Sequence, residues 1–242
     1  VVFIKSTQIG CSFNKYQYIC FRIKPFHKYM KIKGVITGDI IQSTHINPAD
    51  RNLLLDTIQG IIQCTRKWGE NRLDIYRGDS FQILVDNPIQ ALRITLLIRA
   101  GLQAKSPTAF RWDARVALGL GTIDFEREQS VIESDGEAFR NSGWEFDKLG
   151  RSKKLAIRTP WENFNEEFIV STALVDDIVS NWTITQAQAI FLFLSTGKTQ
   201  KEIADDLQKS SQAISKLLIG GKVNLIELYL NRYEQLTTTL IQ

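Results

Sequence analysis

A short polar turn between two β-forming runs constrains the fold of this chain more than any other feature. Residues 73–77 and 80–85 favour strands, and Gly78 and Asp79 stand between them. Glycine and aspartate between two such runs are typical of a β-hairpin. Because a hairpin makes its two strands antiparallel neighbours, the chain is predicted to contain a sheet with Asp79 in one of its turns.

Apolar periodicity and proline positions predict the elements around this hairpin. The expected order is strand, helix, two strands, helix and strand, which is that of the ferredoxin-like plait. In that topology the first strand lies beside the second strand of the hairpin. Besides the hairpin, the expected elements are strands over 32–36, 111–123 and 154–158, and helices over about 48–68, after Pro88, and over 136–149.

The pattern changes to helices after Pro160, so the chain is predicted to be an α+β protein with an all-helical second domain. The expected parts are a basic extension over 1–29, a plait domain over 30–160, a linker over 161–169 and a helical domain over 170–242. Two interpretations of the extension stay open: translation from an upstream start codon, or a native basic arm. The rest of the chain is near neutral, so its net charge does not indicate whether it binds nucleic acid.

Two acids stand where this topology would bring them together. Asp39 follows the first apolar run, and Asp79 lies in the hairpin turn, so both are expected at the same edge of the sheet. Paired carboxylates there would suit Mg²⁺ or Mn²⁺ held against the phosphates of a nucleoside triphosphate. The simpler alternative is that Asp39 caps a local turn and that Gly78 and Asp79 only shape the hairpin.

Four segments, 38–43, 77–82, 115–121 and 134–139, resemble the core shared by class III nucleotidyl cyclases and GGDEF diguanylate cyclases, and most of all the SatD family. The resemblance implies that Asp39, the Ile40 carbonyl and Asp79 bind the metal. It implies nucleotide contacts from Gln42, Ser43, Arg77, Gly78, Arg140 and Asn141. The chain departs from ATP-using cyclases in having Ile75 at the place of a base-reading lysine. Asn141 is also one step out of register, because Arg140 and Trp144 stand at the places of an Asn and an Arg.

Residues 196–220 have the spacing of a helix-turn-helix and resemble the form found in bacterial regulators. Thr199 and Glu202 predict a capping box, and Ser210 predicts the cap of a second helix. DNA contacts are then expected from Lys198, Ser211, Gln212, Ser215 and Lys216. The alternative is a helical hairpin that contacts a protein or the first domain. Residues 223–236 form a candidate homodimer face or part of the core.

Three functions follow from these motifs. The first is a cytoplasmic, DNA-binding transcriptional regulator whose cyclase-like domain binds a metal-nucleotide ligand or dimerises. The alternative is a metal-dependent nucleotidyl cyclase regulated by its helical tail, and the third is a cyclase-like fold kept for dimerisation. The sequence has no apolar run of about 18 residues, so no membrane span is expected. An odd number of cysteines without metal-ligand spacing fits a reducing compartment.

Overall fold

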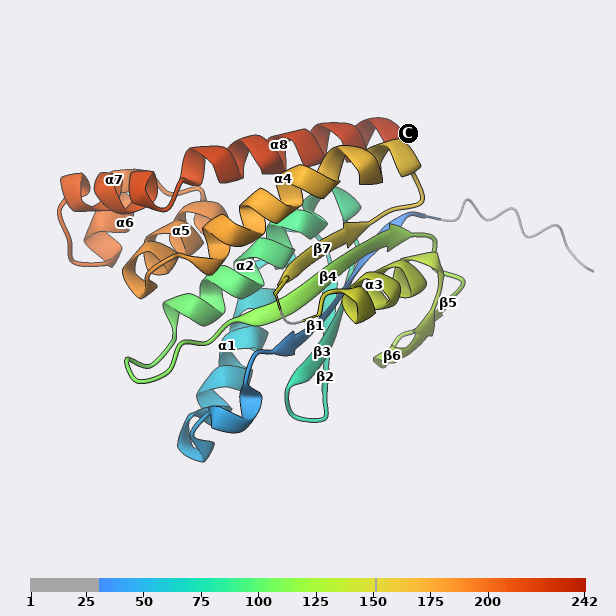
Figure 1. Cartoon of the computed structure of the whole chain (residues 1–242), viewed down its shortest axis with the longest axis horizontal. Coiled ribbons are helices and arrows are strands. Elements are labelled where there is room, and N and C mark those ends of the chain that lie inside the picture. The colour runs from blue at the N-terminus through green and yellow to red at the C-terminus, as the bar shows by residue number, and fades with distance from the viewer. Residues whose placement is uncertain (1–30, 151) are drawn as a thin grey trace, which may run out of the picture.

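The computed structural model describes residues 31–150 and 152–242, so the predicted basic extension lies outside the described residues. In this part of the chain, five strands form one sheet in the order β2-β3-β1-β4-β7 (Figure 1). The strands are β1 (Lys33–Ile40), β2 (Asn71–Tyr76), β3 (Ser80–Val85), β4 (Ala114–Gly121) and β7 (Leu155–Arg158).

The first four strands and two helices form the expected ferredoxin-like plait. Helices α1 (Arg51–Cys64) and α2 (Ala91–Ala104) follow β1 and β3 and pack on one face of the sheet. Within the plait, each pair of neighbouring strands is antiparallel. Helix α3 (Glu137–Lys148) packs on β4 and β1 from the other face and leads into β7, which is parallel to β4 (Figure 1).

Strand β1 continues four residues beyond the run predicted from its apolar residues. Thr37, Gly38 and Asp39 stay in register with β3 on one side and β4 on the other. Glycine is required at position 38, because a Cβ atom there would overlap the Phe81 ring and lie 2.9 Å from the Arg115 carbonyl oxygen. A residue that reads as a strand breaker therefore allows close packing inside this strand.

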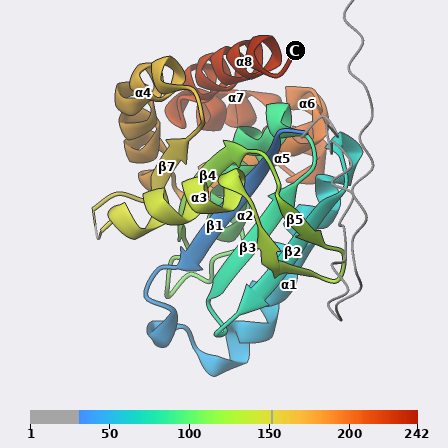
Figure 2. The same ribbon diagram turned by 90° about the vertical axis from the view of Figure 1, so that its right-hand side faces the viewer.

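A small hairpin, β5 (Phe125–Arg127) and β6 (Ser130–Asp135), was not predicted. It crosses in front of β2 and β3 (Figure 2). Arg72 donates to the carbonyl oxygens of Arg127 and Glu128, both at 2.8 Å. Asp74 accepts from the Val131 amide at 2.7 Å. These strands are mostly exposed and polar, so they lack the apolar alternation by which a strand is recognised.

The helical part packs directly on the plait. Residues 161–169, the expected linker, lie mostly in the first half of α4, because Phe164 and Phe168 are buried one turn apart with their rings stacked at 4.4 Å. Helix α5 packs along α2, in which all residues except Arg93 are buried. One apolar core contains side chains from both parts. The helices are α4 (Glu162–Ser180), α5 (Ile184–Thr196), α6 (Gln200–Asp206), α7 (Ser211–Gly220) and α8 (Val223–Leu240).

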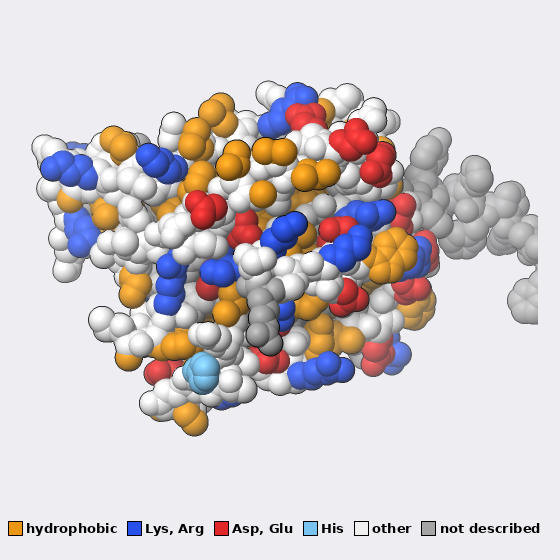
Figure 3. Space-filling model, viewed as in Figure 1, with side chains coloured by type: hydrophobic (Ala, Val, Ile, Leu, Met, Phe, Trp, Pro, Cys, Tyr) orange, Lys and Arg blue, Asp and Glu red, His pale blue; other side chains and the backbone are white. Residues whose placement is uncertain are grey.

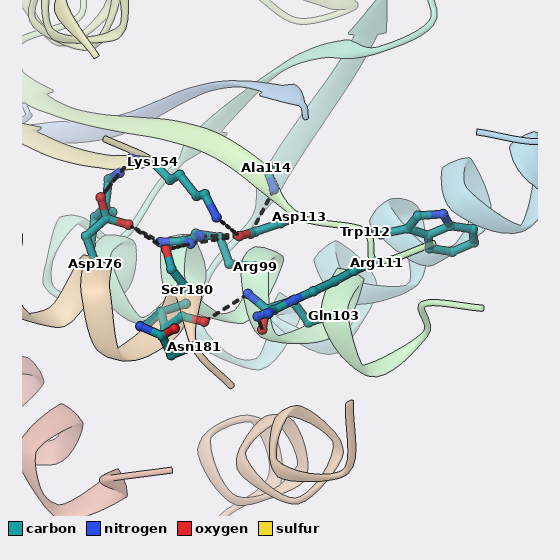
Figure 4. Close-up of polar contacts among 12 residues, drawn as sticks. Arg99, Gln103, Arg111, Trp112, Asp113, Ala114, Lys154, Asp176, Ser180 and Asn181 are labelled. Atoms are coloured by element: carbon teal, nitrogen blue, oxygen red, sulfur yellow. Dashed lines mark hydrogen bonds and ion pairs between the residues drawn. The ribbon is translucent and has the colours of Figure 1, made fainter. Parts of the chain in front are cut away.

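A buried ionic network also joins the two parts (Figure 4). The guanidinium of Arg99 in α2 donates to Asp113 at 2.9 and 2.8 Å and to Asp176 in α4 at 2.7 Å. Lys154 adds a second cation, 3.3 Å from Asp113. Burial by itself would lower the pKa of Arg99, but the two carboxylates raise it. Arg99 is therefore held in its charged form at the contact between α2, β4 and α4.

Within 31–150 and 152–242, no helix has both the length and the apolar character needed to cross a bilayer.

Candidate functional site

The strand register gathers four polar side chains in a row across the sheet. Asp39 on β1 lies opposite Ser80 on β3 and Arg115 on β4, and Tyr76 on β2 lies opposite Ser80. Directly opposed residues on neighbouring strands point to the same face. The face is that of α3, because Thr37, two residues before Asp39, is hydrogen-bonded to Ser142 of α3 at 2.9 Å.

Asp79 reaches this row from the hairpin turn. Its carbonyl oxygen accepts from the Ile40 amide at 2.9 Å, which ties the turn to the end of β1. Its carboxylate accepts from the Ser43 hydroxyl at 2.6 Å and from the Ser80 hydroxyl at 3.3 Å. Asp39 and Asp79 therefore meet at one edge of the sheet, as predicted. We call this cluster the carboxylate edge; it consists of Asp39, Ser43, Tyr76, Asp79, Ser80 and Arg115.

Asp39 already has a strong cationic partner. Arg115 Nε donates to Asp39 Oδ1 at 2.9 Å, and Arg115 Nη2 donates to Asp39 Oδ2. The guanidinium also lies 5.6 Å from the centre of the Phe146 ring and donates to the Gly150 carbonyl at 3.0 Å. The hydrogen bond to Asp39 raises the pKa of Arg115. Arg115 is thus a permanent cation, fixed in a two-bond contact with the first carboxylate.

Tyr76 belongs to the same electrostatic environment and was not predicted from the sequence. Burial raises the pKa of its half-buried phenol, Asp39 and Asp79 raise it further, and Arg77 lowers it. The phenol is therefore protonated at neutral pH and lies within the field of both carboxylates. Tyrosine is an ordinary strand former, so nothing in the local sequence marked this position.

Two loops at the carboxylate edge, the one after β1 and the hairpin turn, contain unusual backbone φ angles. Gln42 after β1 and Arg77 in the hairpin turn have φ angles of 53° and 54°, in the left-handed region that residues other than glycine seldom adopt. Gly78 follows with φ 81°. Such conformations are concentrated at functional sites, where the surrounding structure holds them in place.

Arg51, at the start of α1, brings a further cation to the carboxylate edge. Its Nη2 donates to the Ser43 carbonyl at 3.4 Å, and its Nη1 would lie 3.7 Å from a Cβ atom at Gly78. Nothing in the local sequence marks this exposed arginine as part of a site. Arg51 and Arg115 thus bring guanidinium groups to this edge, and Arg77 stands in the hairpin turn beside it.

Two predicted nucleotide contacts lie far from this edge. Asn141 is buried and donates to the Leu120 carbonyl at 2.8 Å, five residues along β4 from Arg115. Five strand residues span about 17 Å. Arg140 is exposed and pairs with Asp124 at 2.9 Å and Asp135 at 3.2 Å. The fold therefore places both residues at the other end of the sheet, where Asn141 holds β4 and Arg140 pairs with acids next to β5 and in β6.

The metal prediction does not fit the arrangement of these side chains. Both oxygens of Asp39 are engaged by Arg115, and those of Asp79 accept from two hydroxyls. A divalent ion at Asp39 would lie against a fixed guanidinium, and like charges repel strongly at that range. Over the described ranges, no group of three or more His, Cys, Asp or Glu side chains is placed to hold a metal ion.

The predicted helix pair near the C-terminus is present as α6 and α7. The capping box of Thr199 and Glu202 forms as expected, and the Ser210 hydroxyl accepts from the Ala213 amide at 3.2 Å. Four of the predicted DNA contacts lie on α7: Ser211, Gln212 and Lys216 are exposed and Ser215 is half-buried. Lys198 precedes α6 and pairs with Asp206. DNA binding by these residues stays a prediction.

Comparisons with known proteins give weak structural matches. No protein-family profile matches the chain, and no curated protein matches it significantly. It is similar to the active GGEEF domain of a diguanylate cyclase from Vibrio cholerae, at 15% identity and a TM-score of 0.37 over 52% of this chain and 83% of that one. It is also similar to the adenylyl cyclase CyaB from P. aeruginosa, at 15% identity and a TM-score of 0.37 over 55% and 79%. Similarity at this level assigns no function to the chain.

Proposed function

We propose that the protein is a nucleotidyl cyclase-like protein that binds a nucleoside triphosphate at the carboxylate edge. The observation that supports this most is the convergence of Asp39 and Asp79 through one register pair, with arginines on either side. Guanidinium groups bind phosphate through paired hydrogen bonds, and carboxylates accept from ribose hydroxyls and base amines. Arg51 and Arg77 are exposed, so both can reach a ligand.

Groups of the carboxylate edge and the two arginines beside it would share this binding. Arg77 and Arg51 would contact phosphate oxygens, and Asp79, held by Ser43, would accept from a ligand hydroxyl. The Tyr76 phenol would donate a hydrogen bond, since it keeps its proton at neutral pH. No chemical step is assigned, because the residues present do not fit the metal that nucleotidyl transfer would use.

Equilibrium binding of ATP and GTP to the full chain tests this proposal. Two variants are compared with the wild type: Asp79→Asn within the carboxylate edge, and Arg77→Ala in the hairpin turn beside it. Both changes are expected to weaken binding by about tenfold or more, the effect of losing one charge-assisted hydrogen bond. Asp74→Asn is the matched control, because that carboxylate binds the β5–β6 hairpin instead. Binding of neither nucleotide, or equal binding by all variants, would overturn the proposal.

Turnover is checked on the same samples with Mg²⁺ or Mn²⁺ and with a chelator. Chromatography with mass detection is expected to return intact nucleotides. A cyclic product and pyrophosphate that disappear in the Asp39→Ala, Asp79→Ala double variant would instead identify a nucleotidyl cyclase.

A second candidate function, DNA binding, is favoured by the outer side of α7. Ser211, Gln212 and Lys216 are exposed there and lie on a helix that α5, α6 and α8 hold from behind. Lys216→Ala is expected to weaken binding to duplex DNA and to reduce its salt dependence, because one phosphate contact is lost. Lys148→Ala, which removes an exposed lysine at the end of α3, is the control. Binding that is absent, or unchanged in Lys216→Ala, would argue against this function.

The predicted homodimer has a candidate surface on the helical part. Apolar side chains gather over α4 and α8 (Figure 3), and the exposed ones include Ile169, Val170 and Leu174 of α4 and Leu225 and Leu228 of α8. An apolar surface of this kind would suit a second copy of the chain. Leu174→Asp is expected to give monomers in sedimentation experiments, whereas Leu53→Asp on α1 is not.

A further inference from the structure

The pairing of Arg115 with Asp39 has a consequence for cation binding at the carboxylate edge. Asp39 ends β1 at a position where two carboxylates would otherwise attract a divalent cation, yet a side chain of the same protein meets it through two hydrogen bonds. We infer that Arg115 takes the place of a divalent cation at Asp39, so that this edge excludes Mg²⁺ and Mn²⁺ instead of binding them.

Two contacts hold the Arg115 side chain in that place independently of Asp39. Its guanidinium lies over the Phe146 ring of α3, and it donates to the Gly150 carbonyl. A guanidinium with these supports does not swing away at low cost, unlike a free surface arginine. A metal ion would have to displace it or bind beside it, and both carry an electrostatic cost.

The second carboxylate, Asp79, does not offer a metal site in place of Asp39. Each oxygen of Asp79 already accepts one hydrogen bond from a neutral donor, Ser43 or Ser80. The pair of carboxylates is thus matched by one built-in cation and two hydroxyls. Removal of the Arg115 charge leaves Asp39 and Asp79 as two hard oxygen donors at one edge, which is the chemistry that Mn²⁺ accepts.

Mn²⁺ binding to the full chain without nucleotide, followed by electron paramagnetic resonance, tests this inference. The wild-type protein is expected to show no binding that depends on Asp39. Arg115→Met is expected to bind Mn²⁺ at least about tenfold more tightly, since the carboxylate loses an adjacent unit charge. The added change Asp39→Asn should abolish that gain.

Arg158→Met is the matched control. Arg158 resembles Arg115 in exposure, with side chains 36% and 32% exposed, and it too contacts an aromatic ring of α3, that of Trp144. It pairs with Glu145 at 3.4 Å, away from Asp39. This variant is expected to bind Mn²⁺ no better than the wild type.

Two outcomes would overturn the inference: Mn²⁺ binding by the wild type that Asp39→Asn removes, or an Arg115 variant that is folded and binds no more tightly than the wild type. Circular dichroism establishes folding. Where Arg115→Met does not fold, Arg115→Gln keeps an amide donor for Asp39 and carries the test. Because no nucleotide is present, the result is separate from the proposed nucleotide binding.

Discussion

Arg99 of α2 and Asp176 of α4 form an ion pair at 2.7 Å in which the arginine side chain has no exposed surface. Asp176 also accepts from the amides of Lys154 and Leu155 at the start of β7, at 2.7 and 3.3 Å. One carboxylate therefore fixes a plait helix, an edge strand and the first helix of the C-terminal part relative to one another. Figure 4 shows this pair within the polar network that joins the two parts of the chain.

Asp176→Asn is expected to lower the free energy of unfolding by about 3–5 kcal/mol, because loss of one partner leaves a buried charge uncompensated. Urea denaturation measures the change. The control is Arg232→Met, which breaks the exposed pair with Glu167 and should cost less than about 1 kcal/mol. Similar small losses in both variants would show that Arg99 is adequately balanced by Asp113.

Acid is expected to destabilise the protein through Asp113. Burial by itself would raise the pKa of this carboxyl, but Arg99 and then Lys154 and the Ala114 amide lower it below its usual value. The unfolded chain therefore binds the proton more readily than the folded one. The stabilisation is fully present above about pH 4 and is lost as the pH falls through the lowered pKa. Unfolding free energies measured across this range should fall more steeply than in Asp113→Asn.

Gly119 of β4 and Gly143 of α3 are expected to respond in opposite ways to substitution by alanine. A Cβ atom at Gly119 would overlap the Ala138 carbonyl and the Ser142 amide and lie 3.0 Å from the Ser142 Cα atom. Gly119→Ala should therefore push α3 off the sheet and cost several kcal/mol, roughly 3 or more. A Cβ at Gly143, on α3 itself, meets nothing within 4 Å. Gly143→Ala should stabilise the protein by about 0.5–1 kcal/mol.

Alkaline pH is expected to act on the helical part through two tyrosines. Burial raises the pKa of Tyr229 and of Tyr233 well above their usual value. Their hydroxyls are hydrogen-bonded to Thr172 and to the Pro88 carbonyl, both at 2.7 Å. The stabilisation is complete below the unfolded pKa of about 10 and is lost above it, by about 1.4 kcal/mol per pH unit for each tyrosine.

Tyr229→Phe measures one share of this loss. The free energy of unfolding of this variant should depend less on pH above about 10 than that of the wild type. Circular dichroism measures the unfolding, and the absorbance of tyrosinate measures the ionisation. A dependence equal to that of the wild type would show that Tyr229 ionises without unfolding the chain.

Much of the fold was predictable because its signals are local. The hairpin turn at Gly78 and Asp79 identified two neighbouring strands, and helical periodicity located α2 and α3 to within a few residues. The β5–β6 hairpin escaped because its residues are polar and exposed. Residues 161–169 resembled a linker because Trp161 and two asparagines obscured the apolar pair of Phe164 and Phe168. This pair becomes buried only when α8 packs beside α4.

The carboxylate edge likewise has features that were predictable from the sequence and features that were not. The sequence by itself determined that Asp39 and Asp79 would share one edge, because strand order follows from the hairpin and the element order. Only the tertiary structure decided that Arg115, 76 residues from Asp39, would bind that carboxylate, and that Arg140 and Asn141 would lie at the opposite end of the sheet. Apolar periodicity is a property of a few neighbouring residues, so the sequence shows it directly. The partner of a charged side chain depends instead on the register between strands, which long-range packing sets.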